Sequence, residues 1–425
     1  MSTRAETPSN DAAQQFNPMA PDQLEDPYPL YARLRRELPV FYSAMFDLWV
    51  VTRYADISEV EKDPTRFSSA GALDARSAPH PEVLEVLKQG YVKFTSLVQS
   101  DPPDHTRMRA VFGRALSAQR IAAMEAEIRK TADSLIDGFV QAGQADLIQQ
   151  FAYALPGFII CDLLGVPRSD MEQLKRWSDD KTLLMSGTAP LELQVEAAHG
   201  FIAMQRYFIG QLEQRRQSPR EDLLTLLVPQ SMGGSAAMSH QEAVCNAMDL
   251  LAAGHETTTG LIGNGLWLLL QSPEQLQAVR GDLELIPNAL EEMLRIEAPI
   301  RGFFRAVTTE TQLGGAAVPK GGRLFIVYAS GNRDETQFPE PDRFDIRRAD
   351  AKKHLAFGKG IHFCVGAPLA KLEGRIAFEQ LLRRLPNLRL RTDAPTVRRP
   401  YFMLRGFEHL PVAWDVPQRG QSGGT

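Results

Sequence analysis

The hydrophobic pattern of this chain is dominated by helical periodicity, and its longest uninterrupted apolar stretch lies past the middle. Ser239-His-Gln-Glu242 has the spacing of a capping box, in which the two outer side chains satisfy the first backbone N–H groups of a helix. No proline follows before about Leu270, so the pattern predicts a helix of about 31 residues, roughly 46 Å long. Because this helix is apolar over most of its length, we expect it to cross the core.

Shorter helices surround this central helix in the sequence, and short strands interrupt them. Residues 40–42 and 48–51 are β-branched and aromatic and predict a hairpin. Helices are expected over residues 54–62, 121–141, 145–164, 171–185, 192–215 and 222–227, and further strands around 306–309, 311–313, 324–327, 388–390, 401–404 and 411–414. The pattern therefore predicts a mainly α protein with small β-sheets.

The two ends of the chain lack this periodicity. Residues 1–20 and 418–425 are rich in small and polar residues, so we expect both to be flexible tails. No repeat or clear linker divides residues 21–417, which indicates one domain. Residues 71–100 have a degraded pattern with several helix breakers, and a long irregular segment inside a compact protein is commonly functional.

Polar residues and glycines interrupt the central helix at Ala253-Gly-His-Glu-Thr-Thr-Thr-Gly260. Such residues are costly inside a buried helix, so they need a physical reason. One interpretation is a kink in which threonine hydroxyls bond back to carbonyl groups of the preceding turn. The other is a local opening of the helix that leaves room for a small molecule, with Glu256 and Thr257 placed to handle protons.

A glycine-rich segment near the C-terminus carries the most informative cysteine, Cys364. A phenylalanine, a histidine and three glycines surround it: Phe357, Gly358, Gly360, His362 and Gly366. The glycines allow a loop with positive φ angles that approaches a flat object closely, and apolar residues then recur at helical spacing from Val365 to Ile376. A thiol at such a helix N-terminus is favoured as thiolate, the form that ligates a metal. A lone cysteine near a helix start is, by itself, more often an inert buried thiol.

Two pairs of charged residues also have helical spacing. His105 and Arg109 lie four positions apart, and Glu292 and Arg295 lie three positions apart, so each pair shares one face of a helix. Taken alone, both pairs are typical of solvated helix surfaces.

Together these segments resemble the cytochrome P450 family. The pattern F-x-x-G-x-x-x-C-x-G over residues 357–366 is complete and similar to the haem-binding signature of that family. Three further motifs occur in the family's order: H-x-x-x-R at 105–109, A-G-x-E-T-T at 253–258 and E-x-x-R at 292–295. In the family the last motif is structural, and we expect Arg343 to be its third partner. The resemblance covers roughly residues 25 to 415 and implies a prism-shaped, mainly α fold, with haem b between the long central helix and the cysteine loop.

The resemblance also implies roles for individual side chains. Cys364 would be the thiolate ligand of the haem iron, while Thr257 and Glu256 would be the catalytic pair that delivers protons during dioxygen activation. Residues expected to hold the haem are His105, Arg109, Ala253, Gly254, Arg305, Phe357, Gly358, His362, Cys364 and Gly366. Residues expected to line the substrate pocket are Asp249, Ala252, Ala253, Ile300, Phe303 and Phe402.

Asp249 stands out within the apolar part of the central helix. Members of the family usually carry an apolar residue at the matching position, and a lone carboxylate there is costly unless it is paired or hydrated. At ~100° per residue, Asp249 points about 80° away from Thr257, on the flank of the side that would face the haem. Two interpretations stay open: Asp249 pairs with a basic residue of a neighbouring helix, or it faces the cavity and meets a hydroxyl or amine of the substrate.

The activity that the resemblance implies is that of a haem-thiolate monooxygenase, which inserts one atom of dioxygen into a hydrophobic small organic substrate. A separate ferredoxin and its NAD(P)H-dependent reductase would supply the electrons. Four basic residues near the cysteine loop form either a docking patch or a solvated helix face: Lys352, Lys353, Lys371 and Arg375. Peroxygenases driven by hydrogen peroxide replace the Glu256–Thr257 pair, and a ligand-binding protein without turnover would not need it, so both alternatives fit less well.

Charge and composition narrow the functional classes to which the protein can belong. The formal net charge of −5 at pH 7 is opposite to what nucleic-acid binding needs, so we expect no nucleic-acid partner. No apolar run is long enough to span a bilayer and the N-terminus lacks a signal-peptide core, so we expect a cytoplasmic protein without a membrane anchor. The 3 cysteines are odd in number and far apart, which fits reduced thiols.

Overall fold

The computed structural model describes residues 11–71, 73–74, 78–186, 189–228 and 238–416, and it is mainly helical with small sheets. The helices are α1 (Asp11–Gln15), α2 (Pro21–Glu25), α3 (Tyr28–Glu37), α4 (Tyr54–Lys62), α5 (Pro81–Leu87), α6 (Asp104–Ala115), α7 (Ala118–Ala123), α8 (Glu125–Asp137), α9 (Ala154–Leu164), α10 (Met171–Ser186), α11 (Leu191–Gln217), α12 (Leu223–Leu227), α13 (His240–Leu270), α14 (Pro273–Gly281), α15 (Ile286–Ile296), α16 (Tyr328–Gly331) and α17 (Ala367–Arg384). The strands are β1 (Val40–Ser43), β2 (Leu48–Val51), β3 (Phe67–Ser68), β4 (Gln144–Asp146), β5 (Phe303–Val307), β6 (Thr311–Leu313), β7 (Ala316–Val318), β8 (Arg323–Ile326), β9 (Arg389–Leu390), β10 (Val397–Arg398), β11 (Phe407–His409) and β12 (Pro411–Ala413).

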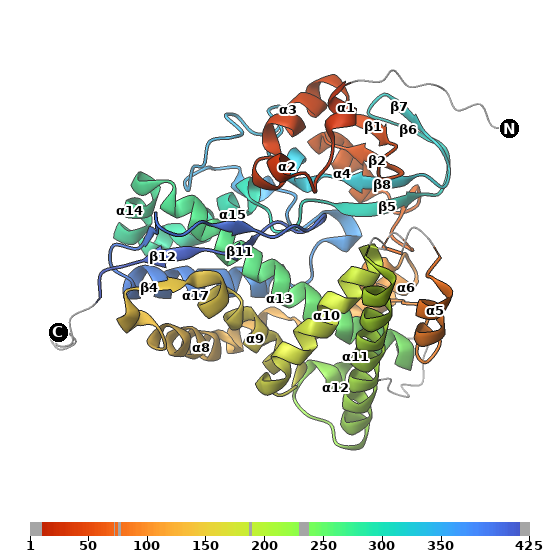
Figure 1. The fold of residues 1–425 in the computed structure, drawn as a ribbon, viewed down its shortest axis with the longest axis horizontal. Helices are drawn as coiled ribbons and strands as arrows, with labels where there is room; N and C mark the ends of the chain where they lie inside the picture. Colours follow the sequence, from red (N-terminus) through yellow and green to blue (C-terminus); the bar gives the residue numbers. More distant parts are fainter. Residues whose placement is uncertain (1–10, 72, 75–77, 187–188, 229–237, 417–425) are drawn as a thin grey trace.

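Helix α13 is the predicted central helix. The Glu242 backbone N–H donates to Ser239 Oγ at 3.2 Å, and the Ser239 backbone N–H donates to Glu242 Oε2 at 2.7 Å, which completes the capping box. The helix runs for 31 residues, from His240 to Leu270, as the hydrophobic pattern predicts. Figure 1 shows it crossing the molecule between the sheet of β1, β2, β8 and β5 and the helices α8, α9 and α17. The core is therefore built around this helix.

The largest sheet has the strand order β1-β2-β8-β5-β3. Strands β1 and β2 form the predicted antiparallel hairpin, with Val40 opposite Val51. Strand β8 pairs in parallel with β2 and antiparallel with β5, so a C-terminal segment completes an N-terminal sheet. Because alternate side chains of a strand point to opposite faces, Phe303 and Arg305 of β5 share one face. That face borders the cavity described below.

The buried ion pair of Glu292 and Arg295 has a different third partner from the one predicted. Both side chains are fully buried, with Arg295 Nε 2.7 Å from Glu292 Oε2. The guanidinium of Arg348 completes the group, with Nε 3.1 Å from Glu292 Oε1. Arg343 contributes only its backbone carbonyl, which accepts a hydrogen bond from Arg295 at 3.1 Å, while its side chain is exposed. The prediction of Arg343 is wrong because the turn that carries it presents carbonyl groups, not side chains, to the pair.

Three other predictions differ from the structure. Residues 11–20 are not a flexible tail, because Ala12 and Phe16 are buried in the core and Arg301 donates to the Pro18 carbonyl at 2.7 Å. The segment 71–100 contains α5, and residues 401–404 form no strand beyond an isolated bridge between Ile300 and Leu404. The predicted tails at 1–10 and 418–425 lie outside the described residues, and the single domain over 21–417 stays a prediction.

Within the described ranges, every helix is too short or too polar to cross a bilayer.

Candidate active site

A cavity lies between helix α13 and the loop that precedes α17. It encloses about 1520 Å³ of empty space, part of which is open to solvent. The predicted site residues that line it are Arg109, Asp249, Ala253, Gly254, Thr257, Ile300, Phe303, Arg305, Phe357, Gly358, His362, Cys364 and Gly366. Side chains from α6, α13, β5 and the cysteine loop, which are far apart in the sequence, therefore meet around one space.

The remaining predicted residues lie outside the wall of this cavity; they are His105, Ala252, Glu256 and Phe402. His105 lies beside His362, with the ring centroids 4.4 Å apart, and so supports the wall from behind. Phe402 packs instead against Phe46 and Phe325, at centroid distances of 5.2 and 4.9 Å. Phe402 was expected in the pocket, but the chain around it folds toward the aromatic cluster of the N-terminal sheet.

The loop that carries Cys364 is folded tightly against α4. The Cys364 backbone N–H donates to the Phe357 carbonyl at 2.8 Å. Gly358 and Gly360 have φ angles of +65° and +64°, which side chains rarely allow, as the sequence predicts. A Cβ atom on Gly360 would lie 2.2 Å from the carbonyl oxygen of Glu61. The glycines therefore let the loop approach α4 while Cys364 faces the cavity.

The thiol of Cys364 experiences opposing influences. Burial raises its pKa, and this effect outweighs the backbone N–H groups of Gly366 and Ala367 and the charge of Arg109, which lower it. The loop alone therefore does not favour the thiolate, contrary to the expectation from the sequence. A bound metal ion deprotonates a coordinating thiol directly, so the N–H groups would stabilise the thiolate once a metal is bound.

Arg109 and His362 line the cavity, and His105 lies next to His362. Arg109 is partly buried, which lowers its pKa, and it lines the cavity together with Cys364. His105 Nε2 and His362 Nε2 are buried and have no hydrogen-bond partner in the described part of the chain. Burial, and then the positive charge of Arg305, lowers the pKa of His362 to about 3. A ligand carboxylate would pair with Arg109, and it would raise the pKa of these imidazoles so that a protonated Nε2 could donate to it.

Glu61, which the sequence reasoning missed, ties Arg305 to the cysteine loop. Its buried carboxylate accepts hydrogen bonds from Arg305 Nη2 at 2.6 Å, from the Tyr328 hydroxyl at 2.9 Å and from the Lys359 backbone N–H at 2.7 Å. Glu61 lies one helical turn after Ile57, on the buried face of α4. A carboxylate on the apolar face of a helix was therefore a signal available in the sequence.

These groups fit the haem that the resemblance implies. Cys364 supplies a metal-ligating sulfur, and a Cβ atom on Gly366 would lie in ordinary contact with Cys364 Sγ, at 3.9 Å, so a flat group can approach the backbone there. Arg109, Arg305 and His362 supply donors for two carboxylates beside the same cavity. The unpartnered imidazole nitrogens are then explained as well.

Helix α13 is continuous at Thr257. The Thr257 hydroxyl donates to the Ala253 carbonyl at 2.6 Å, and the Thr259 hydroxyl donates to the His255 carbonyl at 3.0 Å. These are the bonds of the first interpretation, and the helix has no break that would mark a local opening. The space above the cysteine loop comes instead from the small residues Ala253 and Gly254, which line the cavity.

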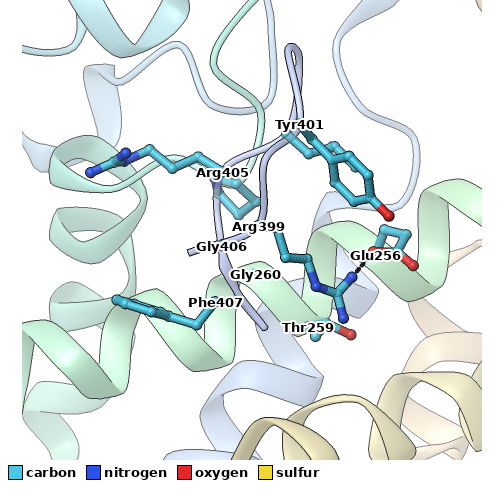
Figure 2. Close-up of a pocket in the computed structure, with 10 residues that line it drawn as sticks. Glu256, Thr259, Gly260, Arg399, Tyr401, Arg405, Gly406 and Phe407 are labelled. Carbon is cyan, nitrogen blue, oxygen red and sulfur yellow. Dashed lines mark hydrogen bonds and ion pairs between the residues drawn. The ribbon is translucent and has the colours of Figure 1, made fainter. Parts of the chain in front are cut away.

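Glu256 points away from the cavity, toward a small recess on another side of α13 (Figure 2). Its carboxylate pairs with Arg399 Nη1 at 2.6 Å and with Lys175 Nζ at 3.0 Å. Burial acts to raise the pKa of Glu256, but Lys175 and Arg399 outweigh it and lower that pKa. Glu256 is therefore an ionised carboxylate held outside the cavity by residues of α10 and of the C-terminal segment.

A second carboxyl that the sequence reasoning missed lines the cavity. Glu373 of α17 is buried, and its Oε2 has no hydrogen-bond partner among the described residues. Burial raises its pKa to about 8. Glu373 lies one helical turn after Leu369, within the apolar face of α17, so its position was also visible in the sequence.

Comparisons with known proteins agree with this geometry. The family model described as Cytochrome P450 matches residues 36–396. Cytochrome P450 monooxygenase PikC from Streptomyces venezuelae is 38% identical over 412 residues, which cover 95% of this chain and 94% of the relative. The 6-deoxyerythronolide B hydroxylase of Saccharopolyspora erythraea is 37% identical, over 92% of this chain and 96% of the relative. Vitamin D(3) 25-hydroxylase from Pseudonocardia autotrophica is 36% identical, over 91% of this chain and 94% of the relative.

Solved structures show the same fold. The structure titled cytochrome P450 CREJ in complex with (4-ethylphenyl) dihydrogen phosphate has a TM-score of 0.89 and 32% identity, covering 95% of this chain and all of that one. The cytochrome P450 CYP109Q5 structure from Chondromyces apiculatus has a TM-score of 0.83 and 35% identity. Family model, relatives and fold agree along nearly the whole length, and the chain belongs to the cytochrome P450 family of haem-thiolate monooxygenases.

Proposed function

We propose that this protein inserts one atom of dioxygen into a hydrophobic small organic substrate by hydroxylation, dealkylation or epoxidation. The observation that carries the proposal is the cavity itself, in which Cys364 and Thr257 border one space. Apolar side chains make up much of the remaining wall: Leu97, Val98, Phe112, Leu116, Ile160, Leu163, Leu250, Ile300 and Phe303. A wall of this composition favours an apolar ligand.

The proposed cofactor is haem b, held by Cys364 at the iron and by Arg109, Arg305 and the imidazoles of His105 and His362 at its carboxylates. When bound, a haem with a thiolate ligand supplies the electron-rich iron needed for cleavage of the O–O bond. The chain's own contribution is to hold that group, exclude bulk water with the apolar wall, and deliver protons.

Thr257 and Glu256 divide the proton delivery between them in this proposal. The Thr257 hydroxyl lies on the cavity wall and holds a proton there, with Ala253 as its present acceptor. Glu256 faces the recess and pairs with Arg399 and Lys175, so it must leave one of these partners to pass a proton toward Thr257. Because its pKa is lowered, Glu256 is ionised at rest. It therefore takes up a proton from solvent before it passes one on.

A ferredoxin and its NAD(P)H-dependent reductase are the proposed electron donors. Lys352 and Lys353 are exposed near the cysteine loop and support docking of an acidic partner. Lys371 and Arg375 support it less, because they pair with Glu291 and Glu379 at 2.8 and 3.0 Å. A docking face therefore centres on residues 352–353.

The test uses the haem-loaded protein with a surrogate ferredoxin, ferredoxin reductase and NADH. Substrate-dependent NADH oxidation with one ¹⁸O atom from ¹⁸O₂ in the product is expected. If hydrogen peroxide alone supported the full rate and no ¹⁸O entered from ¹⁸O₂, the protein would be a peroxygenase. If no product formed under either condition over a broad panel of apolar compounds, the catalytic proposal would be wrong.

A further inference from the structure

Asp249 and Lys181 form an ion pair at the wall of the cavity. Asp249, on α13, lines the cavity, and its Oδ1 accepts a hydrogen bond from Lys181 Nζ of α10. The Asp249 side chain keeps 20% of its surface exposed, and Lys181, which is not part of the wall, keeps 13%. The carboxylate therefore borders the cavity with its counter-ion behind it. Both interpretations from the sequence hold in part, because Asp249 is paired and also reaches the cavity.

One oxygen of this carboxylate is unused. Asp249 Oδ2 is buried and accepts no hydrogen bond from any residue in the described ranges. The other polar residue of this stretch, Asn246, has its amide engaged, since Oδ1 accepts from the Leu97 N–H at 2.9 Å and Nδ2 donates to the Glu242 carbonyl at 2.8 Å. A buried carboxylate oxygen without a donor is costly, so a donor supplied by a ligand would be strongly favoured.

The counter-ion decides what kind of donor fits. Lys181 Nζ is fixed on two sides, by Asp249 and by the ring of Phe94, whose centroid lies 4.1 Å away. Because the ammonium already neutralises the carboxylate, a cationic ligand group would be placed close to a like charge. A neutral hydroxyl meets the free oxygen without that repulsion. Of the two substrate groups that the sequence analysis left open for Asp249, the amine is therefore disfavoured.

We propose that Asp249 Oδ2 accepts a hydrogen bond from the hydroxyl group of a neutral, otherwise apolar substrate. This inference deepens the proposed function and rests on it. Asp249 and Thr257 are ~12 Å apart along the axis of α13, so the substrate is elongated, with its hydroxyl at one end and the oxidised carbon toward the other. Apolar side chains such as Leu250 and Val98 line the same cavity as Asp249 and Thr257.

Binding is measured by isothermal titration calorimetry on the haem-loaded protein, with 1-decanol and its methyl ether, 1-methoxydecane, as matched probes. The wild type should bind the alcohol about tenfold more tightly than the ether, which offers no donor. Asp249→Leu should bind both equally. Thr258→Val, which also changes a polar residue of the wall, is the matched control and should keep the preference for the alcohol.

A second test uses Lys181→Met, which removes the counter-ion of Asp249 and leaves the carboxylate in place. This variant should bind decyltrimethylammonium about tenfold more tightly than the wild type does. If Asp249 served only to fasten α10 to α13, both variants would lose thermal stability while the alcohol-to-ether ratio stayed at the wild-type value, and the proposal would be overturned. The ratio is independent of turnover, so a failed monooxygenase assay contradicts the proposed function without deciding this one.

Discussion

Glu373 is a buried carboxyl group, and no described residue offers a charged partner that would stabilise its ionised form. The residue is 3% exposed on α17, and burial raises its pKa from 4.5 to about 8. At neutral pH it is therefore a protonated acid, held beside the cavity. Glu373→Gln replaces it with a group of nearly the same shape that cannot ionise.

The magnitude follows from the pKa shift. Each pKa unit corresponds to ~1.4 kcal/mol, so ionisation in the folded state costs ~5 kcal/mol more than in the unfolded chain. Because the folded pKa is raised, the stability that this group contributes is complete below the unfolded pKa and is lost as pH rises toward about 8. Between pH 5 and pH 8 the free energy of unfolding should fall by ~4 kcal/mol more in the wild type than in Glu373→Gln.

The assay is urea unfolding of the haem-loaded protein, followed by circular dichroism, at intervals from pH 5 to pH 8. Glu379→Gln is the matched control, because Glu379 lies on the same helix but pairs with Arg129 and Arg375 at 2.7 and 3.0 Å. That variant should lose stability at neutral pH and keep the pH slope of the wild type. Parallel pH profiles for wild type and Glu373→Gln would refute the reasoning, since they would mean that Glu373 ionises normally.

Three further changes test other parts of the site. Thr257→Ala should divert electrons from product to hydrogen peroxide, whereas Thr259→Ala, whose hydroxyl is buried, should not; unchanged coupling of NADH use to product in Thr257→Ala would exclude the relay role. Arg348→Met should lower the free energy of unfolding by ~2–3 kcal/mol, and Arg343→Met by less than ~0.5 kcal/mol. Equal losses in denaturant titrations would contradict the assignment of Arg348 as the third partner of Glu292 and Arg295. Glu61→Gln should speed the transfer of haem to apomyoglobin, because the cysteine loop loses a charged acceptor; an unchanged rate would remove that positioning role.

The elements that the sequence predicted well are those specified by short-range patterns. Helix α13 follows from its capping box and its proline-free apolar run, helix α4 from its periodicity, and the hairpin of β1 and β2 from its β-branched residues. Of the site residues that the family resemblance implied, thirteen line the cavity, among them Arg109 and Gly366. In these segments local propensity and the final packing agree.

Contacts between distant segments could not be predicted from the sequence. The partners of Glu256 come from positions 175 and 399, and nothing in the local pattern around those residues indicates that they meet. Arg348 and Arg343 are both arginines near one turn, and only the path of the backbone decides which guanidinium is buried. Phe402 is apolar and could pack on either side of its segment. Periodicity does not determine such choices, because they depend on the assembled core.

Glu61 and Glu373 are a different case, since each carboxylate lies on an otherwise apolar helix face and was visible in the sequence. The pattern marks such residues as costly, but their roles depend on neighbours from other segments. Glu61 meets the donors of Arg305, Tyr328 and Lys359, while Glu373 meets no donor in the described part of the chain. The same local signal therefore leads to an anchor that accepts three hydrogen bonds in one place and to a protonated acid in the other.

The most direct measurement of the central claim is the absorption spectrum of the reduced, carbon monoxide-bound protein, compared with that of Cys364→Ala. Thiolate ligation by Cys364 predicts the strongly red-shifted Soret band in the wild type and its loss in the variant. Cys161→Ala is the control, because that cysteine is fully buried in the core and should leave the band unchanged. A red-shifted band that persisted in Cys364→Ala would contradict the account.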